Sequence, residues 1–419
     1  MGNIHAFISN KSSSNLTETY CAAWDGNTTK LLELIQTGSD KDKSDGLGRT
    51  PVHVAAMNGH LDCLVMLKEA GYDLDSRDKD GSTPIAYAIL NGRDECFNFL
   101  KDSGINFKTN DKNGNTLPII ATKRNRISYL HDLINTGCDI HRANGLGRTP
   151  VHVAAMNGHL DCIVLLMQEG CDLDSVDLYG NTPIIYAVQN DHIGSFNFLK
   201  DAGCYLKIIN NKGRTLPIIA TERNNDYILS ILIGEGCDLR KADRNGFTPL
   251  DKAAIFGHIS CLSLLLEAKC HLSQGNPISG KSPGVVACLK AAFHDNYDCL
   301  IMLMKAGIDL NCRDEQGLSI AHSACSSGFV ETMNLLRDNG INMNQKSNCG
   351  ITPAHMAASK GHLSCLKIIH SNGDDLGIKD RNGRTPADLA LEGRQEECLA
   401  FLKEVGFGET KAKYRFLPW

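Results

Sequence analysis

The chain has 419 residues, with 43 Lys and Arg against 48 Asp and Glu, so its formal net charge is −5. This balance argues against a strongly basic nucleic-acid-binding surface, and no apolar run reaches the roughly 18 residues of a membrane-spanning helix. The first residues lack the basic and then apolar pattern of a secretory signal, so we expect a cytoplasmic protein, with the nucleus as the alternative.

A spacing of 33 residues organises the chain, with a single longer step of 38 residues before Ala291. Such self-similarity predicts an array of small stacked units rather than two or three globular domains. The alanines that mark the twelve units are Ala22, Ala55, Ala88, Ala121, Ala154, Ala187, Ala220, Ala253, Ala291, Ala324, Ala357 and Ala390.

Glycine lies seven residues before eleven of these anchor alanines, where we expect turns with positive φ. The glycines are Gly48, Gly81, Gly114, Gly147, Gly180, Gly213, Gly246, Gly284, Gly317, Gly350 and Gly383.

The unit around Ala55 shows the predicted elements. Thr50-Pro51 combines a helix-capping residue with a proline suited to the first helical position, and Asn58-Gly59 ends this helix. Leu61, Leu64 and Leu67 mark the apolar side of a second helix, which Gly71 ends. Each unit is therefore predicted to be a turn, a helix, a loop and a second helix.

Some units depart from this pattern. Proline is shifted by one position in Thr116-Leu117-Pro118 and in Thr215-Leu216-Pro217, which should alter how the first helix begins. In the unit of Ala291, Ala287 replaces the proline and Leu289 replaces a histidine, after an insertion rich in Gly, Pro and Ser. We expect a kink or a mobile loop at this insertion.

A longer repeat lies above the first one. Residues 46–63 are identical to residues 145–162, which lie 99 positions later, and residues 116–122 recur at 215–221. A block of three units therefore looks duplicated.

The segments 45–60, 147–159 and 350–362 resemble the ankyrin repeat. This resemblance covers about residues 17–407 and implies an all-α fold, an α-solenoid of stacked ankyrin repeats with hairpin-like fingers. We expect the following domains: a tail at 1–16, repeats one to eight with an N-terminal cap at 17–273, an insertion loop at 274–283, repeats nine to twelve with a C-terminal cap at 284–407, and a tail at 408–419.

Cysteines and histidines recur in phase with the repeat. Seven of the 17 cysteines lie eight residues after an anchor alanine, on the side of the second helix that should be buried. A catalytic pair such as His60 with Cys63 is conceivable, but the same pair recurs as His159 and Cys162, and an active site is normally singular. We therefore expect a scaffold without catalytic residues, cofactor or metal. By resemblance, His53 and its equivalents bond within the turn-to-helix entry.

The family resemblance implies a non-catalytic scaffold or adaptor that binds one or more proteins on the concave side. We expect a monomer without direct nucleic-acid contact, because of the charge balance, and without membrane contact, because the tail has only three cations and a few apolar residues. Exposed positions that break the repeat are the candidate contacts, and aromatic and arginine side chains dominate interfaces. The predicted partner-binding residues are Tyr179, Arg214, Phe247, Phe256 and Phe293. Local packing is the competing interpretation of Phe247 and Phe256. The alternative function is a membrane-associated regulator that uses the tail residues Lys411, Lys413, Arg415, Phe416, Leu417 and Trp419.

Overall fold

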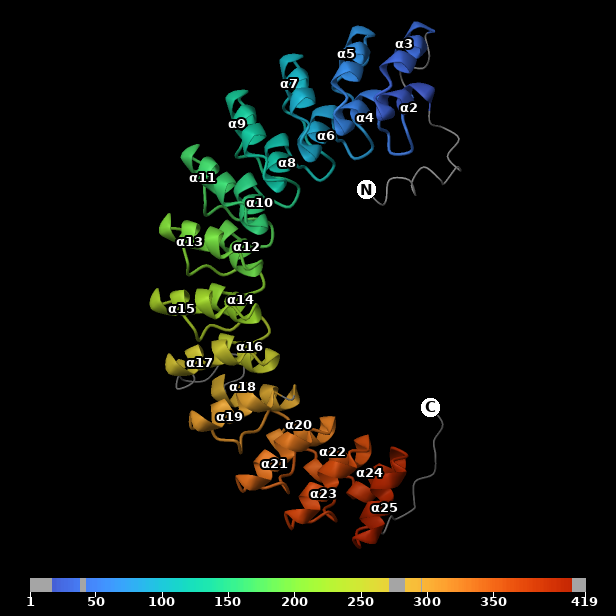
Figure 1. Cartoon of the computed structure of the whole chain (residues 1–419). Coiled ribbons are helices and arrows are strands. Elements are labelled where there is room, and N and C mark those ends of the chain that lie inside the picture. The colour runs from blue at the N-terminus through green and yellow to red at the C-terminus, as the bar shows by residue number, and fades with distance from the viewer. Residues whose placement is uncertain (1–16, 38–42, 271–282, 295, 409–419) are drawn as a thin grey trace. The chain divides into compact units, whose positions relative to one another are not determined.

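The computed structural model describes residues 17–37, 43–270, 283–294 and 296–408 (Figure 1). These residues form 24 helices and three isolated β-bridges. The chain divides into two compact units, Met1–Tyr205 and Leu206–Trp419. The predicted tail 1–16, all but Gly408 of the predicted tail 408–419, and all but Pro283 of the predicted insertion loop 274–283 lie outside the described residues. The kink at the insertion and the domain boundaries therefore stay predictions.

The described residues of the unit Met1–Tyr205 form six helix pairs in two rows, one row of first helices and one of second helices (Figure 1). The first helices, each packed on the next, are α2 (Glu18–Asp25), α4 (Pro51–Asn58), α6 (Pro84–Asn91), α8 (Leu117–Lys123), α10 (Pro150–Asn157) and α12 (Pro183–Gln189). The second helices are α3 (Thr28–Gln36), α5 (Leu61–Glu69), α7 (Asp94–Asp102), α9 (Ile127–Asn135), α11 (Leu160–Gln168) and α13 (Ile193–Asp201).

The unit Leu206–Trp419 repeats this arrangement with six further pairs. Its first helices are α14 (Leu216–Glu222), α16 (Pro249–Phe256), α18 (Pro283–Phe293), α20 (Ile320–Ser327), α22 (Pro353–Lys360) and α24 (Pro386–Glu392). Its second helices are α15 (Asp226–Gly234), α17 (Ile259–Glu267), α19 (Tyr297–Lys305), α21 (Val330–Asp338), α23 (Leu363–Ser371) and α25 (Glu396–Glu404). The predicted all-α fold of stacked helix pairs is confirmed.

The predicted helix boundaries are confirmed in the pair α4 and α5. Thr50 caps α4, Pro51 is its first residue, and Gly59 ends it with a φ of 88°. In α8 and α14 the shifted proline occupies the second helical position, so each helix still begins directly after its capping threonine.

The anchor alanines lie in the shared interior between neighbouring helix pairs. All twelve are buried, and eleven of them are completely inaccessible to solvent. Only a small side chain allows one first helix to approach the next this closely, because packed helices lie about 8–10 Å apart. The 33-residue period is therefore the period of this close contact.

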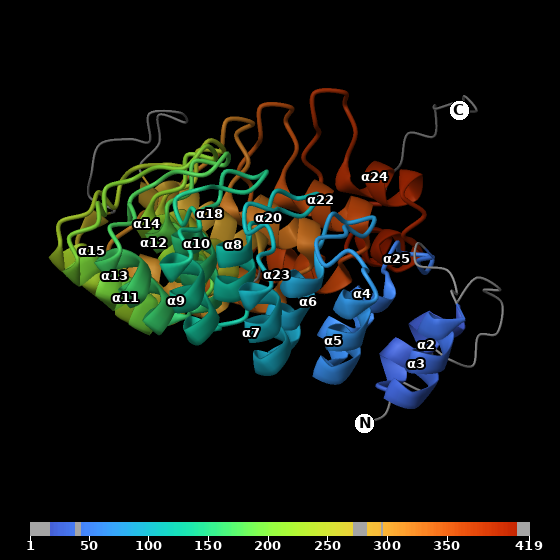
Figure 2. The same ribbon diagram turned by 90° about the horizontal axis from the view of Figure 1, so that it is seen from above.

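A turn, here called a finger, precedes each regular first helix, and the finger glycines adopt positive φ as predicted, for example Gly48 at 80° and Gly317 at 76°. The loops project to one side of the helices (Figure 2). Neighbouring fingers are joined by backbone hydrogen bonds: the amide of Leu178 donates to the carbonyl of Leu146 over 3.0 Å.

Gly284 is the exception, and the prediction of a positive-φ turn there is wrong. It lies in the first turn of α18, which begins at Pro283 and has 11 residues. The regular first helices start at a Thr-Pro pair, but Val286 and Ala287 stand in its place here. Because proline favours the first helical position, the helix begins earlier, at Pro283.

A buried histidine joins each of four first helices to the following finger. His152 Nδ1 accepts a hydrogen bond from the Thr149 amide at 3.2 Å, and its Nε2 lies 3.1 Å from the carbonyl of Asn181. Because an amide can only donate and a carbonyl can only accept, the ring is neutral with its proton on Nε2. His53, His322 and His355 form the same bridge, so the predicted role at the turn-to-helix entry is confirmed. Burial lowers the pKa of all four histidines.

We expect His152→Ala to lower the free energy of unfolding by about 3 kcal/mol at pH 7.5, because two buried hydrogen bonds and ring packing are lost. A lowered folded-state pKa means that the stabilisation is present above the ordinary value of 6.5 and lost as the pH falls through the folded value. The deficit should therefore be smaller at pH 5. Urea unfolding measures both values. The exposed His141→Ala is the control, and equal stability of wild type and His152→Ala at pH 7.5 would contradict the bridge.

Candidate functional site

The side chain that follows the finger glycine changes character between the two units. In Met1–Tyr205 these positions are polar or charged, and they are Arg49, Ser82, Asn115, Arg148 and Asn181. In Leu206–Trp419 they begin and end with arginine but are apolar in between, and they are Arg214, Phe247, Leu318, Ile351 and Arg384. We call the side of each unit formed by the fingers and first helices its finger surface.

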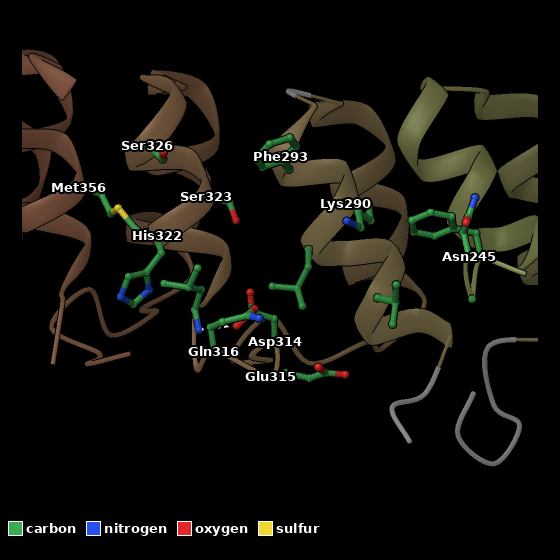
Figure 3. A pocket seen from close by; sticks show the side chains of 15 residues that line it. Asn245, Lys290, Phe293, Asp314, Glu315, Gln316, His322, Ser323, Ser326 and Met356 are labelled. Carbon is green, nitrogen blue, oxygen red and sulfur yellow. Dashed lines mark hydrogen bonds between the residues drawn. The ribbon is translucent and has the colours of Figure 1, made fainter. Parts of the chain in front are cut away.

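An apolar groove of about 480 Å³ lies on the finger surface of Leu206–Trp419 (Figure 3). Its walls come from the finger before α16, from α18, from the finger before α20, and from α20 and α22. The apolar lining residues are Phe247, Val286, Leu289, Phe293, Leu318 and Met356. A hollow of this composition can hold a large apolar side chain.

Phe247 forms one end of the groove and is half-buried. The Nζ atoms of Lys252 and Lys290 lie 5.0 Å and 5.3 Å from the centroid of its ring. Lys252 is itself held by Glu222 at 2.9 Å and by Asp243 at 3.1 Å. The ring is thus fixed by cation–π contacts on a buried ion-pair network, and it serves local packing while one part still borders the groove.

The other predicted contacts divide between different places. Phe293 is 53% exposed and lines the groove together with Phe247. Phe256 is 52% exposed, but it stacks on His258 and does not line the groove. Arg214 pairs with Glu222 at 3.3 Å and so joins the network around Phe247.

Tyr179 belongs to Met1–Tyr205, where it is 49% exposed at a finger tip. The Cζ atom of Arg148 lies 5.9 Å from its ring centroid. The structure therefore brings two of the five predicted residues, Phe247 and Phe293, into one groove.

Further groove residues lie directly before the anchor alanine. This repeat position was not among the contacts predicted from the sequence. Side chains there face the fingers: Tyr87 donates to Asp78 at 2.7 Å and Tyr186 to Asp177 at 2.5 Å. In the groove this position is occupied by Lys290, Ser323 and Met356. Because this position recurs with each anchor alanine, the sequence alone could have identified these residues.

A second groove, of about 500 Å³, lies on the finger surface of Met1–Tyr205 and has a different character. Lys112, Lys123 and Arg148 line it together with four asparagines, and no carboxylate contributes to its lining. Arg148 and Phe247 are equivalent positions 99 residues apart. The two units thus present grooves of different chemistry on the same face of the repeat.

Comparison with protein families accounts for the repeat. Models described as "Ankyrin repeats (3 copies)" match residues 19–111, 118–210 and 194–276, and models described as "Ankyrin repeats (many copies)" match 288–337 and 336–390. These matches cover most of the chain. The chain belongs to the ankyrin-repeat family.

One solved structure similar to this ankyrin-repeat chain is the crystal structure of the human ASB11 ankyrin repeat domain. It has 24% sequence identity and a TM-score of 0.45, and the match covers 49% of this chain and 92% of that one. No curated protein sequence matches this chain. Ankyrin repeats generally mediate protein–protein interaction, and they are typically not catalytic.

The cysteine and histidine ladders of the ankyrin repeats have local partners. Cys162 Sγ lies 3.4 Å from Asn125 Oδ1, while His159 Nδ1 bonds the carbonyl of Thr122 at 2.8 Å, so the two side chains are engaged separately. Burial raises the pKa of Cys96, Cys162, Cys261 and Cys299 to about 11, which disfavours the thiolate of a nucleophile. All 17 cysteines are free thiols.

Two other features were searched for in the described part of the chain. Within those residues, no three His, Cys, Asp or Glu side chains gather as a metal site would require. None of the helices described there combines the length and the apolar character needed to cross a membrane.

Asp251 is a buried acid in α16, at the position that His152 and its equivalents occupy in other repeats. Its Oδ2 accepts hydrogen bonds of 2.8 Å from both the amide and the hydroxyl of Thr248. Its Oδ1 is buried and has no hydrogen-bond partner among the described residues. Burial, with a smaller effect of Asp243, raises the pKa of Asp251 to about 7, although Thr248 and Lys290 oppose the shift.

We expect Asp251 to lower the stability of the protein as the pH rises from 5 towards 7, opposite in sign to the effect of the four buried histidines. A carboxyl with a raised folded-state pKa stabilises the fold fully below its unfolded pKa and loses this effect as the pH rises through the folded value of about 7. The loss should be about 3 kcal/mol at most. Asp251→Asn should remove this dependence, whereas the exposed Asp298→Asn should keep it. Urea unfolding at pH 5, 6, 7 and 8 measures it. The same slope in Asp251→Asn and wild type would contradict a protonated, buried Asp251.

Proposed function

We propose that this ankyrin-repeat chain is a non-catalytic scaffold or adaptor whose partner binds the finger surface of Leu206–Trp419, with the apolar groove as the centre of the contact. The observation that carries the proposal is the groove itself, in which six apolar side chains line about 480 Å³ and Phe293 is 53% exposed. Exposed apolar hollows of this kind are typical of interaction sites, because burying them releases water from a large apolar area.

The predicted contacts take different roles in this proposal. Phe247 and Phe293 are the anchors, since both face the groove. Phe256, on the same first-helix surface but outside the groove lining, belongs to the rim, where contacts contribute less to affinity. Arg214 supports Phe247 through Glu222 and Lys252. Tyr179 would belong to a separate contact on the other unit.

The double variant Phe247→Ala/Phe293→Ala should lower the affinity for the partner at least about tenfold, because central aromatic anchors account for most of the binding energy. The double variant Phe247→Ala/Phe256→Ala should also weaken binding, but Phe256→Ala alone should change it only slightly. The measurement is affinity capture with mass spectrometry to identify the partner, followed by titration of that partner against each variant.

The matched control is Tyr227→Ala, which removes a 47% exposed aromatic side chain from the second helix α15. Circular dichroism and a thermal melt establish that each variant is folded. A folded Phe247→Ala/Phe293→Ala protein that binds the partner as tightly as wild type would refute the groove as the centre of the contact.

A further inference from the structure

The finger aspartates share one geometry, in which the two carboxylate oxygens have separate tasks. The first oxygen closes the turn: Asp380 Oδ1 accepts hydrogen bonds from the amides of Asn382 and Arg384 at 2.8 Å and 2.9 Å. The second oxygen points to the first helix and the side chain after the glycine, and needs a donor there. A half-buried carboxylate without such a donor is costly, because burial disfavours its charge.

In six fingers the second oxygen, Oδ2, has a side-chain partner in its own repeat. The partner is either the residue after the finger glycine or the residue before the anchor alanine. These pairs are Asp45–Arg49 (2.6 Å), Asp78–Tyr87 (2.7 Å), Asp111–Asn115 (2.8 Å), Asp177–Tyr186 (2.5 Å), Asp243–Lys252 (3.1 Å) and Asp380–Arg384 (2.9 Å).

Asp314 is the finger aspartate that lacks this partner. Its Oδ1 accepts the amide of Leu318 at 2.7 Å, so the turn is closed as usual. The two positions that supply the partner elsewhere hold Leu318, which has no donor, and Ser323, whose hydroxyl forms no hydrogen bond with it. Among the described residues, no side chain forms a hydrogen bond or an ion pair with Asp314 Oδ2.

Asp314 is also a lining residue of the apolar groove, beside the exposed Glu315 (Figure 3). The groove therefore combines an apolar floor with a carboxylate whose usual cationic or hydroxyl partner is missing. Lys290 lies on α18 near Phe247, so the positive charge of the groove is at the Phe247 end and the negative charge is at the finger of Asp314. A bound segment would meet both an apolar surface and a defined direction of charge.

We infer that the groove binds a protein segment in which a large apolar residue lies next to an arginine. The apolar side chain packs between Leu289, Phe293 and Leu318, and the guanidinium pairs with Asp314 Oδ2, as Arg49 and Arg384 pair with their own finger aspartates. This inference rests on the proposed function and adds the chemistry of the partner.

Arginine fits the site better than lysine for a geometric reason. Its planar guanidinium can donate to two oxygens at once, and Glu315 offers a second carboxylate next to Asp314. Arg384 shows this use within the same unit, since it pairs with Asp380 at 2.9 Å and with Glu392 at 3.2 Å. The arginine of the partner would thus pair with Asp314 as Arg384 pairs with Asp380 within the last repeat.

The probe is a positional-scanning library of N-acetylated, C-amidated octapeptides, applied to the immobilised full chain. Wild type should enrich arginine next to Leu, Phe, Met or Trp. Asp314→Asn should bind the best arginine peptide about tenfold more weakly. It should bind the same peptide with methionine in place of arginine as wild type does. Asn144 and Asn210 already close fingers with their side-chain oxygens, so this substitution keeps the turn.

A second variant tests the same inference by supplying the missing partner of Asp314 from within the chain. Leu318→Arg reproduces the Asp45–Arg49 and Asp380–Arg384 pairs, so it should occupy Asp314 and abolish the preference for arginine. Glu331→Gln removes an exposed carboxylate from α21 in the same repeat and should change nothing.

The outcomes separate the two proposals. Enrichment of apolar peptides without arginine, or equal binding of the arginine peptide by wild type and folded Asp314→Asn, would overturn the inference and leave the groove as a binding site. A library that enriches no sequence on a folded wild-type chain would count against the groove itself, and with it against the proposed function.

Discussion

The fold depends on the constraint that no helix pair can bury its apolar faces alone. The anchor alanines are buried where neighbouring first helices and the second helix of the same pair pack together, and Cys63, Leu64 and Leu67 of α5 are likewise fully buried. The buried histidines add direction to this contact, since each satisfies its own helix start and a carbonyl of the following finger. Stability in such an array is the sum of unit and neighbour contributions.

This constraint also decides which positions are available for binding. Interior positions are committed to a neighbour, so variation is tolerated mainly after the finger glycine, before the anchor alanine and along the exposed side of the first helix. In Met1–Tyr205 these positions largely satisfy one another: Tyr186 bonds Asp177, and Arg148 contacts both. In Leu206–Trp419 an apolar residue replaces the polar one at Phe247, Leu318 and Ile351. The change at Leu318 leaves the second oxygen of Asp314 without a side-chain partner among the described residues, whereas Asp243 beside Phe247 still pairs with Lys252.

The fold could be predicted almost completely from the sequence because it is encoded by repeated, local signals. Threonine caps, prolines at the first helical position and positive-φ glycines each act over a few residues. The helices predicted for one unit could therefore be transferred to most of the other units. Gly284 shows the limit of this reasoning: its phase was right, but the proline before it begins a helix and overrides the turn. The buried ladder of cysteines was predictable for the same reason as the alanines.

The candidate site was only partly predictable, because a groove depends on how side chains from different repeats meet. Phe256 and Phe293 occupy similar phases, are about equally exposed and each pack on a nearby histidine, yet only Phe293 lines the groove. The isolated position of Asp314 could have been found from the sequence by comparing its fourth and ninth following residues with those of the other fingers. That comparison needs the knowledge, which the coordinates supply, that both positions face the same carboxylate oxygen.

The departures from the repeat pattern concentrate near one another along the chain. Asp251 replaces a bridging histidine, Gly284 leaves the turn conformation, and Asp314 loses its internal partner, all between α16 and α20. Asp251 Oδ1 and Asp314 Oδ2 have no hydrogen-bond partner among the described residues. Polar groups without an internal hydrogen-bond partner are expected at sites where a protein sacrifices stability for function. The groove overlaps this stretch through α18 and the finger of Asp314, so the carboxylate that lacks its internal partner lies within the surface that we propose for binding.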